Sequence, residues 1–250
     1  DEIFETFPPL VSAAGVTGDR GMDFGPVVDG HVLEQMPVLA IEAGEHHAVP
    51  TVIGTNADEA ANLLGGFTVS SEQEYEQAVS SFYGDAGSDF VDDVLAAYPV
   101  GDYDSPQDAF VQVVTDQRFT CPNRLYARTM ADAQTEPVYR YLFTRNAQLA
   151  NGTRPAQHGI ELLYVFGTLR DIPGFSPVEE DLELSDNLIA YWTHLGRNGS
   201  FNDVADAENL ITWPAYTVDG DEVLVLDAPL STRTGVRNDK CDVWEQLYDI

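Results

Sequence analysis

Short apolar runs alternate along the chain with longer segments in which apolar residues recur every three or four positions. The short runs predict buried β-strands, and the longer segments predict amphipathic helices. Strands are expected at 49–54, 138–143 and 223–226. Helices are expected after Ser71, across 91–98, after Ser105, across 184–195 and after Asp239. This alternation is typical of an α/β fold with a mixed, mostly parallel sheet flanked by helices.

Several helix boundaries follow from capping signals. Ser71 and Glu74 form a capping box, which marks the start of a helix. Ser105 is followed by a proline, and proline at the first helical position costs no hydrogen bond. The apolar stripe over 184–195 predicts a helix that ends at Gly196, because glycine accepts the left-handed conformation that often terminates helices.

Two of the predicted strands lead into segments that carry titratable groups. The strand at 49–54 continues into a polar loop that ends at Glu59, and the strand at 138–143 continues into a polar loop at 144–157 and then His158. In open α/β sheets, ligands and catalytic groups gather outside the carboxyl ends of the strands. A carboxylate followed by an imidazole is also the order in which an α/β-hydrolase presents its acid and base after an earlier serine.

The composition narrows the classes of partner. The 250 residues include 42 Asp and Glu against 12 Lys and Arg, which gives a formal net charge of −30. Nucleic acids and anionic membrane surfaces attract clustered basic residues, so neither is an expected partner. No apolar run approaches the roughly 20 residues needed to cross a bilayer, so we expect no membrane span. The 44% hydrophobic content argues for a folded domain rather than a disordered acidic tail.

The acidic residues are spread over the whole chain, and Lys240 is its only lysine. We interpret them as a solvated surface that keeps the protein soluble, and within that interpretation we favour a halophilic or marine source. A cation store would need loops of the D-x-D-x-D-G type, and the sequence has none, so we expect no metal site. The remaining histidines are expected to be ordinary core or surface residues, because no Cys or acidic partner lies at metal-ligand spacing. They are His31, His46, His47 and His194.

Several short motifs follow one another in a characteristic order. They are F-G-P-V-V-D-G at 24–30, I-G-T-N-A-D-E at 53–59, D-Q-R-F-T-C-P at 116–122, A-Q-H-G-I-E at 156–161, Y-V-F-G at 164–167, W-P-A-Y at 213–216, and finally Cys241 with Trp244. In this order they resemble the C-terminal half of the type-B carboxylesterases, the family of cholinesterases and para-nitrobenzyl esterases. The resemblance covers nearly the whole chain from about residue 24. It implies the C-terminal portion of an α/β-hydrolase fold and an esterase that needs no cofactor.

The resemblance also implies roles for individual residues. His158 would be the general base that takes the proton of a nucleophilic serine, and Glu59 would orient its imidazole. Asp58 competes with Glu59, because a shift of the loop by one residue would exchange the two carboxylates. Ala60 stands where the family usually has glycine. Glu161, one helical turn after His158, is either a second partner of the site or a surface acid.

The serine of such a triad is missing from this sequence. The family's G-x-S-x-G elbow lies well over a hundred residues before the glutamate motif, and only 58 residues precede Glu59. Ser176 and Ser200 lack the required glycines. We therefore expect residues 1–250 to be the C-terminal segment of a single α/β-hydrolase domain. It would act on a small-molecule ester together with an N-terminal segment that supplies the serine and the oxyanion hole, either a nicked fragment or a separate subunit, and alone it would be inactive.

Cys121 and Cys241 match the positions of a disulfide in the cholinesterase branch, so the resemblance implies that they are bridged; two buried free thiols are the alternative. A bridge would indicate an oxidising compartment, and hence a secreted or periplasmic protein. Asn151 and Asn198 begin glycosylation sequons. Asp239 is expected to cap the last helix, which carries Cys241.

A non-catalytic cholinesterase-like domain used in adhesion is the alternative function. Such a domain needs neither a triad acid nor a triad base. The presence of both Glu59 and His158 therefore favours the esterase.

Overall fold

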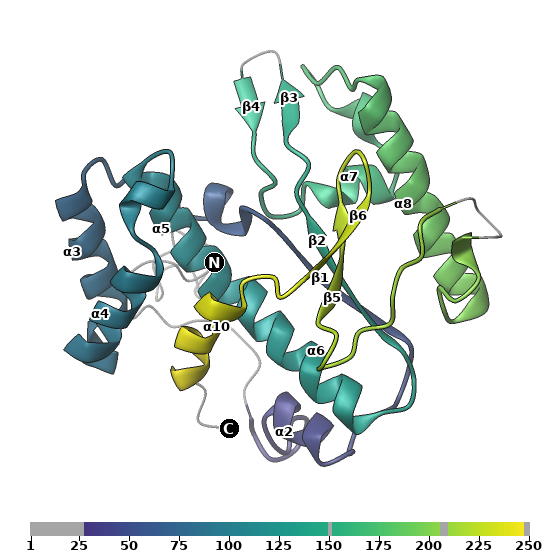
Figure 1. Ribbon diagram of the computed structural model, residues 1–250, viewed down its shortest axis with the longest axis horizontal. Coiled ribbons are helices and arrows are strands. Elements are labelled where there is room, and N and C mark those ends of the chain that lie inside the picture. The colour runs from purple at the N-terminus through teal and green to yellow at the C-terminus, as the bar shows by residue number, and fades with distance from the viewer. Residues whose placement is uncertain (1–27, 150–151, 206–209, 248–250) are drawn as a thin grey trace, which may run out of the picture.

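The computed structural model describes residues 28–149, 152–205 and 210–247. At its centre is a four-stranded sheet in the order β1-β2-β5-β6 (Figure 1). The strands are β1 (Thr51–Asn56), β2 (Val138–Phe143), β5 (Glu222–Leu226) and β6 (Ser231–Thr234). Strands β1, β2 and β5 are parallel, and β6 is antiparallel to β5. The mixed, mostly parallel sheet predicted from the sequence is confirmed.

Helices cover both faces of the sheet because side chains alternate along each strand. On one face, Tyr139 and Phe143 of β2 pack into a cluster with Tyr164 and Leu188. On the other face, Val138 packs with Ala127. The helices concerned are α7 (Glu161–Val165) and α8 (Glu179–Asn198) on the first face and α6 (Cys121–Ala133) on the second (Figure 1).

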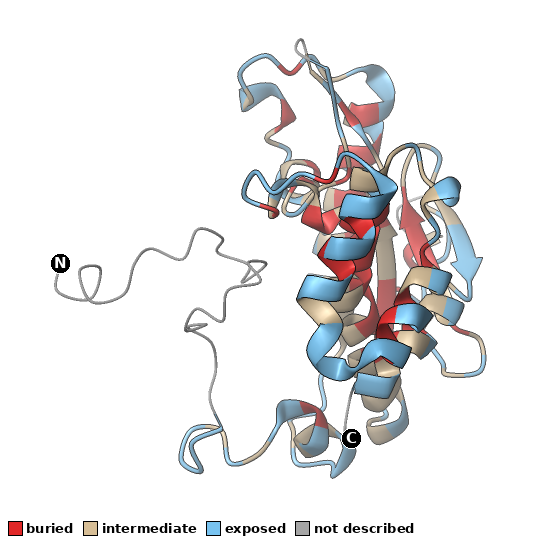
Figure 2. Cartoon of the chain, turned by 90° about the vertical axis from the view of Figure 1, so that its left-hand side faces the viewer, coloured by how far each residue is buried: buried red, intermediate tan, exposed pale blue. Residues whose placement is uncertain are grey.

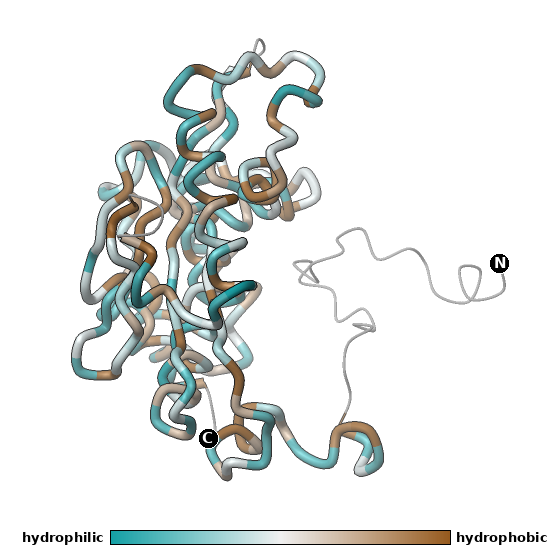
Figure 3. Tube along the Cα trace, turned by 90° about the vertical axis from the view of Figure 1, so that its right-hand side faces the viewer, coloured by the Kyte–Doolittle hydropathy of each residue, from teal (hydrophilic) through white to brown (hydrophobic). Residues whose placement is uncertain are grey.

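A group of helices beside the sheet forms a second buried cluster. It consists of α3 (Glu72–Tyr83), α4 (Ser88–Ala97), α5 (Pro106–Thr115) and α10 (Asn238–Trp244). Val79, Val94, Phe110 and Trp244 are fully buried in this cluster. Buried residues line the inner sides of the helices and exposed residues their outer sides (Figure 2), and hydrophobic and hydrophilic stretches alternate along the trace (Figure 3). No helix among the described residues is long and apolar enough to cross a membrane.

The capping signals place two helix starts correctly. Ser71 caps α3 by accepting a hydrogen bond from the backbone N–H of Glu74, although the Glu74 carboxylate accepts from Ser70 rather than from Ser71. Ser105 caps α5 in the same way, with Asp108 as the donor. Both helices therefore begin where the sequence predicts.

Three predicted boundaries are wrong. The strand expected at 49–54 is displaced by two residues, because β1 spans Thr51–Asn56 and includes the first two residues of the expected loop. Helix α8 continues through Gly196 and ends at Asn198, because Gly199 adopts the left-handed conformation (φ 71°) and donates to the carbonyl of Leu195. Asp239 does not cap α10; Arg237 occupies that position and Asp239 lies in the first turn, where a carboxylate still interacts favourably with the helix dipole.

The segment predicted as a polar loop at 144–157 contains a short hairpin. Its strands are β3 (Ala147–Leu149) and β4 (Gly152–Arg154). The remaining short helix, α2, spans Pro37–Glu42. Residues 24–27 of the first motif, together with Asn151 and Tyr248, lie outside the described part of the chain.

An aromatic ring of β2 packs directly against the backbone of β1. Gly54 lies opposite Tyr141, and a Cβ atom at Gly54 would lie 2.1 Å from Cδ1 of that ring. Only glycine fits there. The same register places Asn56 level with Phe143, so the segments that follow the two strands emerge side by side.

Candidate active site

Glu59 and His158 meet where β1 and β2 end. Glu59 begins a 3₁₀ turn (Glu59–Asn62) directly after β1, and His158 follows the hairpin that extends β2. The Nδ1 atom of His158 lies 2.7 Å from Oε2 of Glu59. The backbone N–H of His158 also donates to the carbonyl of Glu59 at 3.3 Å. The structure thus brings together the two residues that the sequence predicts as acid and base.

The carboxylate of Glu59 is buried and fixed at both oxygens. Its side chain is 7% exposed, and Oε1 accepts a hydrogen bond of 2.8 Å from the backbone N–H of Asn56. Burial raises the pKa of the Glu59 carboxyl, and the hydrogen bonds from Asn56 and His158 oppose that rise. The group is therefore rigid and desolvated, as suits a carboxylate that orients an imidazole.

The imidazole of His158 is half-exposed and supported on one side. Its ring contacts Phe119, with 5.2 Å between the ring centroids. Phe119 lies in a π-helical turn (Asp116–Thr120) between α5 and α6. Such turns re-aim side chains and are frequent at functional sites. Because Nδ1 donates its proton to Glu59, Nε2 is left as the acceptor that can take up a proton from a nucleophile.

The two neighbouring acids take different positions. Asp58 does not face His158; its Oδ1 accepts from the amide of Gln112 at 2.7 Å, and burial raises the pKa of its carboxyl. Glu161 is tied to the site through Asn56, whose amide donates to it and also to the carbonyl of Gln157. The structure therefore pairs Glu59, not Asp58, with the imidazole.

Three residues of the site were not found by sequence reasoning. Asn56 donates hydrogen bonds to Glu59 and Glu161. The ring of Phe119 contacts that of His158, and Gln112 donates to Asp58. Asn56 and Phe119 stand in the motifs at 53–59 and 116–122 but were given no role, and Gln112 is the one amide within an otherwise apolar stretch of the α5 sequence at 109–114. A polar residue in such a buried stretch normally has hydrogen-bond partners.

A sequence model described as the carboxylesterase family matches residues 6–244. The chain belongs to this family. It is similar to the Bungarus fasciatus acetylcholinesterase (27% identity over 90% of this chain), the Felis catus carboxylesterase 5A (29% over 88%) and the Dictyostelium discoideum crystal protein (26% over 92%). The chain spans 39%, 42% and 44% of these relatives, which is less than half of each.

Solved structures show the same fold. A thermophilic PNB esterase superimposes with a TM-score of 0.69 at 23% identity, over 89% of this chain and 44% of that one. A second PNB esterase gives a TM-score of 0.67 at 23% identity, over 88% and 43%. This carboxylesterase-family chain therefore has the α/β-hydrolase fold, and it matches less than half of either structure.

The two cysteines of this carboxylesterase-family chain form a disulfide. Cys121 at the start of α6 is bonded to Cys241 in α10, 120 positions away, which confirms the pairing implied by the resemblance. The bridge connects the group of helices behind Glu59 to the helix that covers the sheet. It therefore fixes α10 close to the π-helical turn that carries Phe119.

The other histidines take no part in the pair. Nε2 of His46 lies 3.1 Å from the amide oxygen of Gln134, and Nε2 of His194 lies 2.9 Å from Asp203. His31 is exposed. Across 28–149, 152–205 and 210–247, no group of three or more His, Cys, Asp or Glu could hold a metal ion.

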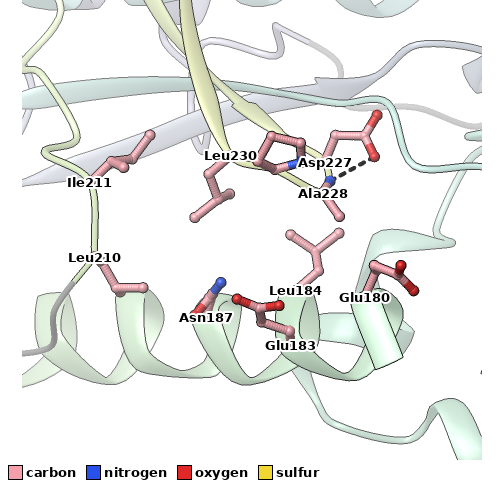
Figure 4. Close-up of a pocket in the computed structure, with 10 residues that line it drawn as sticks. Glu180, Glu183, Leu184, Asn187, Leu210, Ile211, Asp227, Ala228 and Leu230 are labelled. Atoms are coloured by element: carbon pink, nitrogen blue, oxygen red, sulfur yellow. Dashed lines mark hydrogen bonds between the residues drawn. The ribbon is translucent and has the colours of Figure 1, made fainter. Parts of the chain in front are cut away.

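A separate hollow of about 520 Å³ lies between α8 and the segment that follows β5 (Figure 4). Glu180, Glu183 and Asp227 line it together with leucines such as Leu184 and Leu230. Among the described residues that line it there is no Ser, Cys or His. The hollow therefore offers no serine nucleophile and no imidazole base, and neither Glu59 nor His158 lines it.

Proposed function

We propose that this chain is the acid- and base-bearing portion of a serine carboxylesterase. The observation that carries the proposal is the 2.7 Å contact between His158 Nδ1 and Glu59 Oε2 at the carboxyl ends of adjacent parallel strands. In a member of the carboxylesterase family, this is the arrangement of two members of a Ser–Glu–His triad.

The reaction follows from the geometry. Nε2 of His158 takes the proton of a serine hydroxyl as the serine oxygen attacks the ester carbonyl, and the imidazolium then protonates the departing alcohol. Glu59 stabilises that imidazolium without taking its proton. A water molecule, deprotonated by His158 in turn, hydrolyses the acyl-enzyme. Each step needs Nδ1 to stay bound to Glu59, which the buried position of the carboxylate ensures.

The serine and the oxyanion hole would come from an N-terminal segment. Among the described residues, β1 is the edge strand of the sheet, and the relatives that match this chain are more than twice as long as the matched part. We propose that residues 1–250 form the C-terminal segment of one α/β-hydrolase domain. The N-terminal segment would be either part of the same chain before nicking or a separate subunit.

An apolar surface beside the site supports such a partner. A groove of about 370 Å³ runs between α7 and α8, with Tyr141 and Trp192 in its wall and Glu161 at its edge. Leu162 is 49% exposed there and Phe166 is 71% exposed. Burying such side chains is favourable at roughly 25 cal/mol per Å² of apolar surface. A covering segment would bury this groove and place its own residues next to the half-exposed His158.

The disulfide and the charge suggest where the enzyme works. A bridged Cys121–Cys241 pair is typical of secreted or periplasmic proteins. A net charge of −30 with a single lysine suits a surface adapted to concentrated salt. Esterase activity that persists at molar KCl and fails at low salt would support this adaptation, whereas activity indifferent to salt would argue against it.

The experiment that tests the function uses the protein together with its serine-bearing segment. We expect hydrolysis of a p-nitrophenyl ester and labelling of that segment by a fluorophosphonate. His158→Ala should abolish turnover and leave the two segments assembled, whereas His31→Ala, at an exposed histidine, should leave turnover unchanged. Phe166→Ser should weaken assembly more than the matched change Val178→Ser.

Three outcomes would contradict the proposal. Full activity of the 250-residue chain alone would show that it holds its own nucleophile. Unchanged turnover of the His158→Ala protein would remove His158 from the mechanism, and an assembled but inactive wild-type protein would favour the non-catalytic domain.

A further inference from the structure

Helix α5 holds the turn that carries Glu59. The side-chain amide of Gln112 donates to the carbonyl of Ala57 at 3.0 Å and to Oδ1 of Asp58 at 2.7 Å. Gln112 is 7% exposed, so water cannot readily replace these partners. Both hydrogen bonds fix the two residues that immediately precede Glu59.

A second contact from α5 fixes the residue that follows. Three positions after Gln112, and hence on the same side of the helix, the hydroxyl of Thr115 accepts a hydrogen bond of 3.0 Å from the backbone N–H of Ala60. Ala60 is completely buried. Helix α5 therefore forms hydrogen bonds with the turn on both sides of Glu59, while the carboxylate of Glu59 faces His158.

The orientation of the Gln112 amide is determined by Arg237. The guanidinium of Arg237 donates to Oε1 of Gln112. A guanidinium can only donate, so the amide oxygen must face Arg237 and the amide nitrogen must face Asp58. Arg237 has a left-handed backbone (φ 62°), which is uncommon for a residue other than glycine, and its Nε lies 3.7 Å from the buried carboxylate of Asp116.

We propose that Gln112, oriented by Arg237, is a positioning residue that makes Glu59 rather than Asp58 the partner of His158. The inference rests on the proposed function. A shift of the turn by one residue would carry Asp58 towards the imidazole. That shift would break both hydrogen bonds from Gln112 and leave its buried amide nitrogen without an acceptor. This relay, the chain of hydrogen bonds from Arg237 through Gln112 to Asp58, thus determines which of the two adjacent carboxylates contacts His158.

Loss of Gln112 should affect the chemical step rather than substrate binding. None of the hydrogen bonds of Gln112 involves Nε2 of His158, so a substitution at Gln112 should not change substrate binding directly. A displacement of about 1 Å at a catalytic group costs on the order of a hundredfold in rate. For Gln112→Asn, whose amide is one methylene too short to reach both partners, we expect kcat to fall by about tenfold to a hundredfold with KM unchanged.

The test is a double-mutant cycle in the protein assembled with its serine-bearing segment. Gln112→Glu places a carboxylate against Asp58 and should lower kcat. Combining it with Asp58→Asn restores the hydrogen bond between positions 112 and 58 with reversed polarity, since the introduced amide can donate to the introduced carboxylate while Arg237 still donates to the latter. The bond to the carbonyl of Ala57 stays broken, so kcat should recover in part. Gln107→Glu is the control, because its side chain in the same helix accepts from Val69 and can go on doing so.

A second readout does not depend on turnover. The low-field NMR resonance of the proton between His158 Nδ1 and Glu59 reports on their contact even in a protein without esterase activity, so failure of the relay is distinguishable from failure of the proposed function. We expect Gln112→Glu and Gln112→Asn to lose this resonance, and the double variant and Gln107→Glu to keep it.

Three results would overturn the relay. One is wild-type kcat with an unchanged resonance in both single variants at Gln112. Another is a loss in Gln112→Glu that Asp58→Asn does not restore. The third is a lower melting temperature in the single variants with no change in kcat or in the resonance, which would show that Gln112 only stabilises the fold.

Discussion

Glu59 and His158 touch each other, yet their surroundings are built in different ways. The side chain of Glu59 is 7% exposed, and both of its oxygens accept hydrogen bonds from this chain. The side chain of His158 is 51% exposed; Glu59 holds it at one nitrogen and Phe119 contacts its ring. The carboxylate of Glu59 thus has its partners within this chain, whereas the Nε2 side of His158 is left exposed.

The difference extends beyond the two side chains. Behind Glu59 lies the helical cluster of α3, α4, α5 and α10, in which Val79 and Phe110 are completely buried. Beside His158 lie α7 and the residue after it, where Leu162 and Phe166 remain exposed. Preorganisation of the acid is therefore a property of this chain, whereas a dry environment for the base requires another surface.

The largest effect should come from replacing either member of the pair. Glu59→Gln reverses the tautomer of His158 and should lower kcat by about 10⁴-fold, and His158→Gln should abolish turnover. Their effects on stability should differ. Burial raises the pKa of Glu59, so keeping its carboxylate ionised inside the fold costs stability, and Glu59→Gln should keep or raise the free energy of unfolding.

Urea denaturation at pH 7 measures this difference. His158→Gln changes a half-exposed side chain and should alter the free energy of unfolding by no more than about 0.5 kcal/mol. A large decrease in the free energy of unfolding for both Glu59→Gln and His158→Gln would contradict this comparison. The surroundings of the buried acid and of the half-exposed base would then not differ as described.

The next effect concerns the helical cluster behind the acid. Replacing both Cys121 and Cys241 by Ser removes a crosslink between residues 120 positions apart and should lower the free energy of unfolding by about 3 to 5 kcal/mol. Denaturation of the double variant, beside the wild-type protein with and without a reductant, checks this. A loss below about 1 kcal/mol would mean that packing alone holds the cluster together.

Much of the fold could be predicted because its strands and helix starts are local signals. The apolar run at 138–143 became β2 residue for residue, and Ser71 and Ser105 cap the helices they were expected to cap. Gly196 shows the limit of such signals. Two glycines lie near the end of α8, and only the backbone of the folded chain shows that Gly199 takes the left-handed position.

The site was predictable only as far as its motifs reach. Glu59 and His158 stand in short motifs, so they were found, and the choice between Glu59 and Asp58 was left to the family pattern. What places Glu59 against the imidazole is a contact between Gln112 and Asp58, 54 positions apart, and a bond from Arg237, 125 positions from Gln112. No local pattern in the sequence relates such distant residues.

The smallest expected effect is a pH dependence of the free energy of unfolding that arises from Asp116, in the helical cluster behind Glu59. Asp116 is buried beside Tyr98, which donates to it at 3.0 Å, and burial raises the pKa of the Asp116 carboxyl although the charge of Arg237 opposes this. A raised pKa means that the folded state binds a proton more tightly than the unfolded state. Its contribution to stability is therefore full below the ordinary value of 3.8 and is lost as the pH rises through the raised value.

Asp116→Asn removes this titration and should make the chain comparatively more stable as the pH rises. We expect the difference in free energy of unfolding between Asp116→Asn and the wild-type protein to shift in favour of the variant between pH 4 and pH 7, measured by urea denaturation. An advantage of Asp116→Asn that shrinks with rising pH would mean that Arg237 outweighs burial. The buried carboxylate of Asp116, in the helical cluster behind Glu59, would then be stabilised by its ion pair with Arg237. The contrast between this cluster and the open surroundings of His158 would depend on that ion pair rather than on desolvation.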